Sequence, residues 1–282
     1  MNLTLQSLNA ERSTVDRIAL MVGAPAIDIG DADHYAWRCR GISYSEALKV
    51  ELDRICYEAG IDYAFSAPSA ALSDFKLLAM DMDSTLITIE CIDEIADMQG
   101  LKPQVAAITE AAMRGELEFD ESLIQRVALL KGLDASALQR VYDERVQLSP
   151  GAENMLTAIK AAGLKTLLVS GGFTFFTDRI KTRLGLDVTH ANELEIVDGK
   201  LTGKVLGGIV NAEEKKLTVQ RVCADLGISP AQAIVMGDGA NDLKMMDIAG
   251  LSVAFRAKPI VRAQAGVALN FVGLDGILPI FA

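Results

Sequence analysis

The sequence has little of what several classes of protein need. Its 282 residues include only two histidines, His34 and His190, and neither lies near a motif that would make it catalytic. No apolar run approaches the roughly 20 residues of a membrane-spanning helix, and the N-terminus lacks the basic and apolar segments of a secretory signal. Basic residues are also outnumbered, 27 to 38, and the net charge of −11 argues against nucleic-acid and anionic-membrane partners.

Cysteine is scarce as well. The four cysteines, Cys39, Cys56, Cys91 and Cys223, are scattered along the chain without CxxC spacing. This distribution favours buried thiols in a reducing compartment over a zinc site or a disulfide framework. We therefore expect a cytoplasmic protein, and its length is sufficient for two domains with a large core.

One stretch, residues 75–85, organises the rest of the chain. An almost unbroken apolar run ends there in Asp81 and Asp83, and two hydroxyl residues follow. Such a run predicts a strand buried on both faces, as in a parallel sheet. Residues i and i+2 of an extended chain point the same way, so both carboxylates should project into one crevice. Mg²⁺ would offset their repulsion, although Asp and Ser are also ordinary turn residues.

Two further apolar runs, 164–169 and 233–236, are predicted strands that end in a similar way. The first is followed by Ser170 and two glycines, and the second by a glycine and Asp238. Glycines at a strand-to-helix turn allow backbone N–H groups to approach an anion, and the helix N-terminus adds a favourable field. Because parallel strands end at one edge of a sheet, these residues and Asp81 should converge. The convergence favours a functional site over three unrelated turns.

Residues 1–72 are predicted to form a separate domain. Alternating strand and helix patterns occur at 2–8, 14–22, 26–30, 34–40, 45–59 and 61–65. This β-α-β-β-α-β order is the ferredoxin-like motif, and it resembles the ACT-type regulatory domains found beside amino-acid enzymes. ACT domains that bind amino acids usually have a glycine in the first strand–helix loop, and residues 9–13 contain none. A structural or dimerising role is therefore as consistent with the sequence as ligand binding, and 66–71 is a predicted linker.

Residues 73–282 are predicted to form an α/β domain with a Rossmann-like parallel sheet. Helical patterns at 91–98, 104–113, 120–131 and 135–145 interrupt it after the first strand. An insertion at this place, about 90–148, predicts a lid that excludes water from a reaction. Asp198 and Gly199 predict a hairpin turn. Lys215 lies in the first turn of a predicted helix, where a cation opposes the helix dipole, so we expect it to have a functional partner.

Four segments together resemble the motifs of the haloacid dehalogenase superfamily of phosphatases: 81–85, 170–172, Lys215 and 237–242. Within that superfamily, residues 75 to 275 resemble the phosphoserine phosphatase family, because the lid residues also match. The resemblance implies Mg²⁺-dependent hydrolysis of the small molecule O-phospho-L-serine through an aspartyl phosphate, as the last step of serine biosynthesis.

The same resemblance implies a role for each site residue. Asp81 would be the nucleophile and Asp83 the general acid and base, and both would hold Mg²⁺ together with Asp238. Glu90 would pair with the substrate ammonium group and Arg126 with its carboxylate. The other residues implied to contact the substrate are Met113, Phe119, Ser170, Gly171, Lys215 and Asn241. Asp242 would support the residues that contact the substrate and metal without contacting the substrate itself.

Several alternatives stay open at this point. A phosphotransferase that passes the aspartyl phosphate to a second alcohol shares all four motifs, as does a phosphatase for another small phosphomonoester. A catalytically idle amino-acid sensor is disfavoured by the complete set of catalytic residues. Met113 and Phe119 could be ordinary core residues of the lid, and Lys216 could replace Lys215, although the spacing to Asp238 favours Lys215. The sequence leaves open whether the protein is a homodimer.

Overall fold

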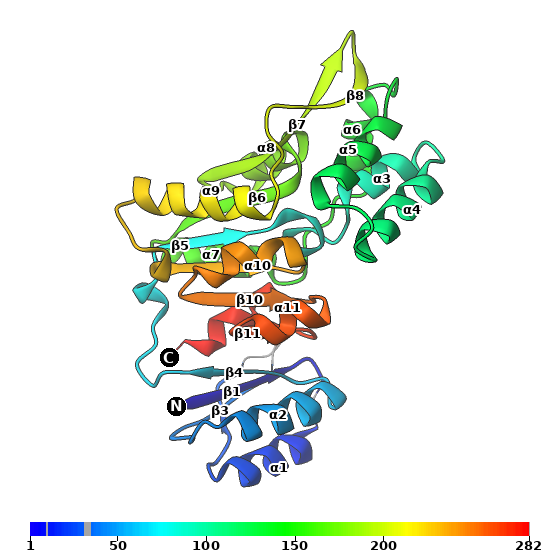
Figure 1. Cartoon of the computed structure of the whole chain (residues 1–282). Coiled ribbons are helices and arrows are strands. Elements are labelled where there is room, and N and C mark those ends of the chain that lie inside the picture. The colour runs from blue at the N-terminus through cyan, green and yellow to red at the C-terminus, as the bar shows by residue number, and fades with distance from the viewer. Residues whose placement is uncertain (10, 31–34, 282) are drawn as a thin grey trace. The chain divides into compact units, whose positions relative to one another are not determined.

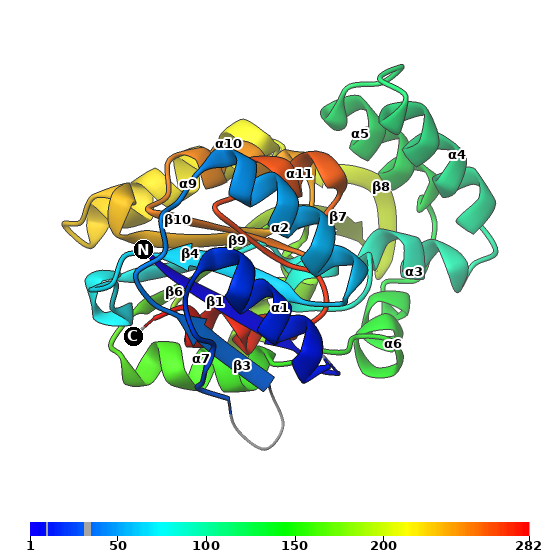
Figure 2. The same ribbon diagram turned by 90° about the horizontal axis from the view of Figure 1, so that it is seen from below.

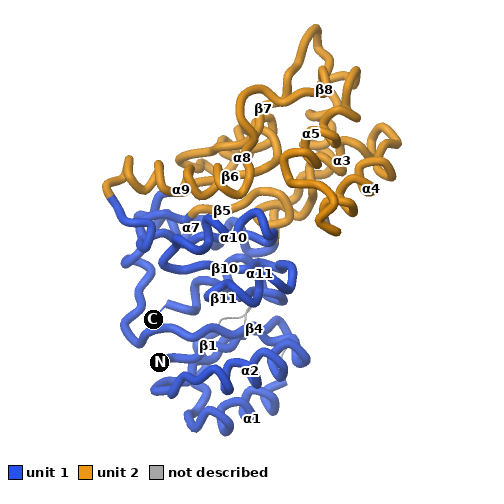
Figure 3. The backbone as a smooth tube through the Cα atoms, in the orientation of Figure 1, with its two compact units in different colours: residues 1–78, 150–165, 228–282 blue, residues 79–149, 166–227 orange. Residues whose placement is uncertain are grey.

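The computed structural model describes residues 1–9, 11–30 and 35–281 (Figure 1). The chain divides into two compact units (Figure 3). The first contains residues 1–78, 150–165 and 228–282, and the second contains 79–149 and 166–227. These units differ from the predicted domains 1–72 and 73–282, whose boundary remains a prediction.

The N-terminal part of the first unit has the β-α-β-β-α-β order expected from the sequence. Its elements are β1 (Asn2–Ser7), α1 (Arg12–Val22), β2 (Ile27–Asp28), β3 (Tyr35–Cys39), α2 (Glu46–Glu58) and β4 (Asp62–Ser66). The strands are antiparallel in the order β2-β3-β1-β4. Helices α1 and α2 lie over one face of these strands (Figure 2). Leu3 and Leu5 of β1 share a buried core with Ile18 of α1 and Leu52 of α2. The predicted start of the second central strand at His34 lies outside the described residues.

The sheet of the first unit continues beyond this motif. Strand β4 pairs antiparallel with β11 (Val267–Leu269), which is followed by β10 (Leu251–Phe255) and β9 (Ala233–Gly237) in parallel register. The Asp62 carboxylate accepts hydrogen bonds from the backbone N–H groups of Asn270, Phe271 and Val272, at 2.7, 2.8 and 3.0 Å. The β-α-β-β-α-β motif is thus joined to the parallel strands through a continuous sheet and buried hydrogen bonds.

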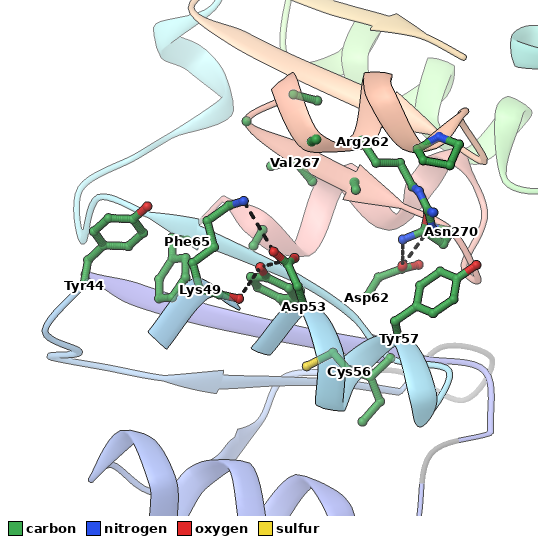
Figure 4. Close-up of a pocket in the computed structure, with 18 of the residues that line it drawn as sticks. Tyr44, Lys49, Asp53, Cys56, Tyr57, Asp62, Phe65, Arg262, Val267 and Asn270 are labelled. Carbon is green, nitrogen blue, oxygen red and sulfur yellow. Dashed lines mark hydrogen bonds and ion pairs between the residues drawn. The ribbon is translucent and has the colours of Figure 1, made fainter. Parts of the chain in front are cut away.

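Three helices complete the first unit, α7 (Ala152–Ala161), α10 (Leu243–Asp247) and α11 (Pro259–Gln264). A cavity of about 630 Å³ lies beside the β4–β11 junction, between α2 and α11 (Figure 4). Lys49 at this cavity lies 3.5 Å from Asp53, and the Arg262 guanidinium lies over the ring of Tyr57, 4.7 Å from its centroid. These two side-chain cations therefore already contact a neighbouring side chain.

The second unit begins with the last two residues of β5 (Leu77–Met80). Its other strands are β6 (Lys165–Phe173), β7 (Val188–Val197) and β8 (Lys200–Leu206), in spatial order β5-β6-β7-β8. Strands β6 and β7 are parallel, and β7 and β8 form the predicted hairpin, with Asp198 and Gly199 at positive φ. Helix α8 (Thr174–Leu184) connects β6 to β7 in sequence, and α9 (Ala212–Asp225) follows β8.

The helical insertion predicted after β5 is confirmed. It consists of α3 (Cys91–Asp97), α4 (Lys102–Met113), α5 (Phe119–Leu129) and α6 (Ser136–Glu144), which gather beside β8 (Figure 1). The turn between α5 and α6 is bonded to the hairpin: the Gly132 N–H donates to the Leu201 carbonyl at 2.8 Å, and the Leu201 N–H donates to the Leu133 carbonyl at 2.9 Å. This end of the lid is therefore anchored. Within the described ranges, no helix combines the length and apolarity needed to cross a membrane.

The structure corrects one detail of the predicted sheet. Strand β6 does not end at 169 but runs to Phe173, with a shift of register between Val169 and Phe173. Val169 lies opposite His190 and Phe173 lies opposite Asn192, so four residue steps of β6 match two steps of β7. The small residues between them take up the excess as a bulge, which the apolar pattern of β6 alone does not reveal.

Candidate active site

Asp81 directly follows β5 and forms an ion pair with Lys215 of α9. The Lys215 Nζ lies 2.9 Å from Asp81 Oδ2, and the two residues are 0% and 5% exposed. The other oxygen, Asp81 Oδ1, accepts the Met82 N–H at 2.7 Å. An isolated buried ammonium group would be costly, so this pairing explains how a lysine occupies the first turn of α9. Lys216, by contrast, is partly exposed.

Asp83 lies in a second, adjoining set of hydrogen bonds. Its Oδ1 accepts the backbone N–H of Cys91 at 2.8 Å, and its Oδ2 accepts the Ser170 hydroxyl at 3.2 Å. Burial raises the pKa of Asp83, while hydrogen bonds from Cys91 and Ser170 and the charge of Lys215 oppose that rise. The carboxyl group is therefore a weaker acid than an exposed aspartate, as a proton donor near neutral pH requires.

The backbone turns sharply between the two aspartates and the lid, while Asp81 and Asp83 themselves keep extended φ and ψ angles. Residues Met82–Leu86 form an irregular turn in which Ser84 takes a φ of 53°. This left-handed conformation costs a non-glycine residue roughly 1 kcal/mol or more. The Ser84 hydroxyl donates to Glu90 Oε1 at 2.7 Å, and its N–H donates to the Ile89 carbonyl at 3.1 Å. The turn thus orients Glu90.

The two glycines after Ser170 are required by space rather than by a positive φ. A Cβ at Gly172 would lie 2.4 Å from Asp83 Oδ2 and 3.0 Å from Ser170 Oγ. A Cβ at Gly171 would lie 3.0 Å from Cζ of Phe119. The Gly172 N–H donates to Ser170 Oγ at 2.8 Å. These glycines therefore make room for a carboxylate on one side and a lid side chain on the other.

The structure describes the side chains of Phe119 and Arg126 in the lid but not that of Met113. Phe119 begins α5 and lies against Gly171, while Arg126 lies in the last turn of that helix. Burial lowers the pKa of Arg126, and the nearby charges of Asp93, Glu90 and Asp83 oppose this shift. Asp93, Glu90 and Asp83 are thus electrostatic neighbours of Arg126. Met113 is the last residue of α4, and its side chain lies outside what the structure describes.

The first unit contains the remaining predicted residues. Asp238 directly follows β9 and is partly buried, and Asn241 lies in the short helical turn Ala240–Asp242. The fully buried Asp242 accepts the Gly239 N–H at 3.0 Å through Oδ2. A Cβ at Gly237 would lie 2.4 Å from that same oxygen. The carboxylate of Asp242 therefore shapes the loop that carries Asp238.

Sequence reasoning missed some polar residues of the second unit. Asp93, in the first turn of α3, has a buried Oδ1 with no hydrogen-bond partner among the described residues, and burial raises its pKa against the charge of Arg126. Its spacing of three residues from Glu90 on one helical turn was an available signal. Asn192, Asp120 and Asn211 also make buried or half-buried hydrogen bonds. Of these three residues, only Asn211 was indicated by the local sequence, because asparagine is a preferred N-cap residue and a predicted helix follows it.

Known proteins of similar sequence include hydrolases that act on phosphate esters. The family model of the haloacid dehalogenase-like hydrolases matches residues 75–250. The phosphoserine phosphatase of Polaromonas sp. is 59% identical over 224 residues, which cover 78% of this chain and 95% of that protein.

Solved structures extend the similarity to the N-terminal part. A HAD-family hydrolase from Salmonella enterica serovar Typhi aligns with a TM-score of 0.92 at 32% identity, over 100% of this chain and 99% of that one. A phospho-aspartyl intermediate analogue of phosphoserine phosphatase aligns with a TM-score of 0.69 at 39% identity, over 74% and 99% of the two chains. The likeness to the Salmonella hydrolase therefore includes the β-α-β-β-α-β motif.

Proposed function

The chain belongs to the phosphoserine phosphatases among the haloacid dehalogenase-like hydrolases, and we propose that it hydrolyses O-phospho-L-serine to L-serine and phosphate through an aspartyl phosphate on Asp81. This reaction is the last step of serine biosynthesis. One observation supports the assignment above the others: Asp81 is a buried carboxylate paired with the buried ammonium group of Lys215, beside Asp83 and Ser170. That combination suits attack on a phosphorus atom.

In the first half-reaction, an oxygen of ionised Asp81 forms a bond to phosphorus and the bond from phosphorus to the serine oxygen breaks. Asp83 gives its proton to that departing oxygen, which its raised pKa favours. Lys215 and the Ser170 hydroxyl bind phosphoryl oxygens and stabilise the charge of the transition state. Asp81 needs no base, because it is already a carboxylate in its ion pair with Lys215.

In the second half-reaction, Asp83 is the base. It takes a proton from water, whose oxygen attacks the phosphorus atom of the aspartyl phosphate, and the bond from phosphorus to Asp81 breaks. Asp83 is thereby protonated again, and Asp81 is again a carboxylate. The backbone N–H of Cys91, 2.8 Å from Asp83 Oδ1, keeps the base oriented in both steps.

The donor set of the chain fits a divalent cation. Asp81, Asp238 and Asp242 are carboxylates of the type and number that could hold a metal ion, and oxygen ligands of this kind suit Mg²⁺. We assign the ligands to Asp81, Asp238 and the backbone carbonyl of Asp83, with Asp242 orienting the loop of Asp238. Bound Mg²⁺ would offset the repulsion between the Asp81 carboxylate and the phosphate dianion.

The amino-acid part of the substrate is assigned to the lid. Glu90 would pair with the ammonium group and Arg126 with the carboxylate, for which a planar guanidinium is well suited. Phe119, with Met113, would shield the site from water. Gly171 and Asn241 would contact the phosphoryl group, and Asn241 would also support Lys215. The electrostatic influence of Glu90 and Asp83 on Arg126 supports this arrangement.

The cellular setting and the domain boundary follow as inferences. We infer a cytoplasmic location from the four buried, free thiols, which suit a reducing compartment. We retain 1–72 as an ACT-like domain and 73–282 as the phosphatase domain, because the β-α-β-β-α-β motif ends with β4 at Ser66.

Phosphate release from a set of small phosphomonoesters, with Mg²⁺ and with a chelator, tests the function. We expect phosphoserine to be hydrolysed fastest and only with the metal. Asp81→Asn should lower turnover roughly a thousandfold or more without unfolding the protein, and acid quenching should find phosphate on Asp81. Phosphate on another residue would refute the nucleophile. Transfer to an added alcohol in preference to water would identify a phosphotransferase.

A further inference from the structure

We propose that Asp120 and Asn211 form a latch that holds the substrate end of lid helix α5 against the start of α9, the helix that carries Lys215. The latch deepens the proposed function, on which it rests: it gives two residues outside the catalytic motifs a positioning role in retaining phosphoserine.

Asn211 makes both halves of the connection. Its Oδ1 accepts the backbone N–H groups of Glu213 and Glu214, each at 3.1 Å, and so caps α9. Its Nδ2 donates to both carboxylate oxygens of Asp120, each at 3.1 Å. The Asn211 carbonyl accepts the N–H of Lys215 at 2.9 Å. One amide side chain therefore orders the turn that presents Lys215 and also binds the lid.

Asp120 is placed where it can control the lid. It is the second residue of α5, next to Phe119, whose ring lies against Gly171. Its carboxylate lies near the N-termini of both α5 and α9, where the helix dipoles favour a negative charge. When the Asp120–Asn211 bonds break, the residue next to Phe119 loses its hydrogen bonds to the N-cap of α9.

Asn192 fixes the surface that receives the latch. This buried residue of β7, 1% exposed, donates through Nδ2 to the Gly171 carbonyl at 2.7 Å and accepts the Val210 N–H at 2.9 Å through Oδ1. Val210 directly precedes Asn211. The bulge that contains Gly171 and the start of α9 are therefore tied together, which gives Asp120 a rigid partner.

The opposite end of α5 is bonded separately. Gly132 and Leu133, beyond the end of the helix, are hydrogen-bonded to Leu201 of the hairpin. Release of the latch can therefore free the Phe119 end while the hairpin end stays attached. Gly115, which precedes α5 and has a φ of 76°, supplies a left-handed turn in the adjoining loop. The described contacts thus give the lid one anchored end and one releasable end.

Exchange of the two side chains tests the latch. Asn211→Asp keeps a capping oxygen for α9 but places a carboxylate opposite Asp120, so the lid should be repelled. We expect the KM for phosphoserine to rise about tenfold with kcat lowered less than twofold, on the scale of one hydrogen bond to a charged group. The KM for p-nitrophenyl phosphate, which has no amino-acid part, should change less than twofold. The double variant Asp120→Asn/Asn211→Asp restores an amide–carboxylate pair and should recover the KM to within about twofold.

A second readout separates the latch from the assigned reaction. Hydrogen exchange of the backbone amides in α5 requires no activity, and it should accelerate near Phe119 in Asn211→Asp and return to the original rate in the double variant. Ser45→Asp, which adds a carboxylate at the N-cap of α2, controls for the charge change and should leave α5 unaffected. Unchanged exchange in Asn211→Asp, or a double variant no better than Asn211→Asp, would overturn the latch. Absence of phosphoserine hydrolysis by the unmodified enzyme would instead refute the proposed function.

Discussion

The Lys215 ammonium group lies 2.9 Å from Oδ2 of Asp81, and both side chains are buried. Each charge therefore stabilises the other, because a buried charge has lost the stabilisation that water provides. The pair suits the proposed roles, a nucleophilic carboxylate on Asp81 and a phosphoryl-binding cation on Lys215. Removal of either partner should lower both the stability and the activity of the protein.

Lys215→Met should lower kcat/KM for phosphoserine by a factor that corresponds to about 3–5 kcal/mol of transition-state stabilisation, the scale for breaking a buried ion pair. The physical reason is that Asp81 loses its compensating charge and the transferring phosphoryl group loses a cation. Lys216→Met, the matched control on the next residue, should change kcat/KM less than twofold. Steady-state kinetics of both variants decide the matter; comparable losses would mean that the assignment to Lys215 is wrong.

The kcat for phosphoserine should fall as pH rises through the raised pKa of Asp83, because the departing oxygen then receives no proton. A raised pKa in the folded state also means that the stability contributed by this group is fully present below the ordinary pKa of ~4 and is lost as pH rises through the raised value. Hydrolysis of p-nitrophenyl phosphate should vary less with pH, because p-nitrophenolate departs without a proton. Identical pH profiles for the two substrates would contradict the acid role.

Glu90→Gln and Arg126→Ala should each lower kcat/KM for phosphoserine by a factor that corresponds to roughly 2–5 kcal/mol, the scale for losing one partner of a charge pair that bound substrate would bury. Hydrolysis of a phosphomonoester without ammonium and carboxylate groups should suffer far less. Arg114→Ala provides a control, because this lid arginine is exposed and pairs with Glu116. Equal losses on both substrates would indicate that Glu90 and Arg126 only hold the lid together.

Asp62→Asn should lower the free energy of unfolding by about 2–3 kcal/mol. The buried carboxylate accepts three backbone N–H groups from residues 270–272, and an amide would turn a donor toward at least one of them. Glu58→Gln, at an exposed residue on α2, serves as the control and should change stability by less than about 0.5 kcal/mol. Urea unfolding measures both variants; equal stabilities would mean that the β4–β11 junction contributes little.

Features encoded by short segments were predictable from the sequence. Apolar runs located the buried strands at Leu77–Met80 and Ala233–Gly237, and helical periodicity located the lid helices. Buried strands lack alternation and surface helices repeat their apolar residues every three or four positions, so both signals are local. The residue types at the strand ends then suggested which chemistry to expect there.

Features that depend on distant partners were not predictable. Asp62 looked like an ordinary strand residue, yet its partners lie more than 200 residues away. Small residues at 66–71 predicted a linker, and nothing in that stretch indicates that Tyr63 pairs with Ala268 in the sheet. The bulge in β6 requires knowledge of the register with β7, and the Asp120–Asn211 contact joins residues 91 positions apart. No local pattern carries such information.

The four buried thiols have a practical consequence for measuring local opening. They lie at Cys39, Cys56, Cys91 and Cys223, in β3, α2, α3 and α9. Burial raises the pKa of each thiol, to about 12 for Cys56, so the reactive thiolate forms mainly when a segment opens to water. Alkylation rates followed by mass spectrometry would therefore report opening free energies for four separate elements, without any engineered label. Cys91 would report on the base of the lid, and its protection should increase when substrate is bound.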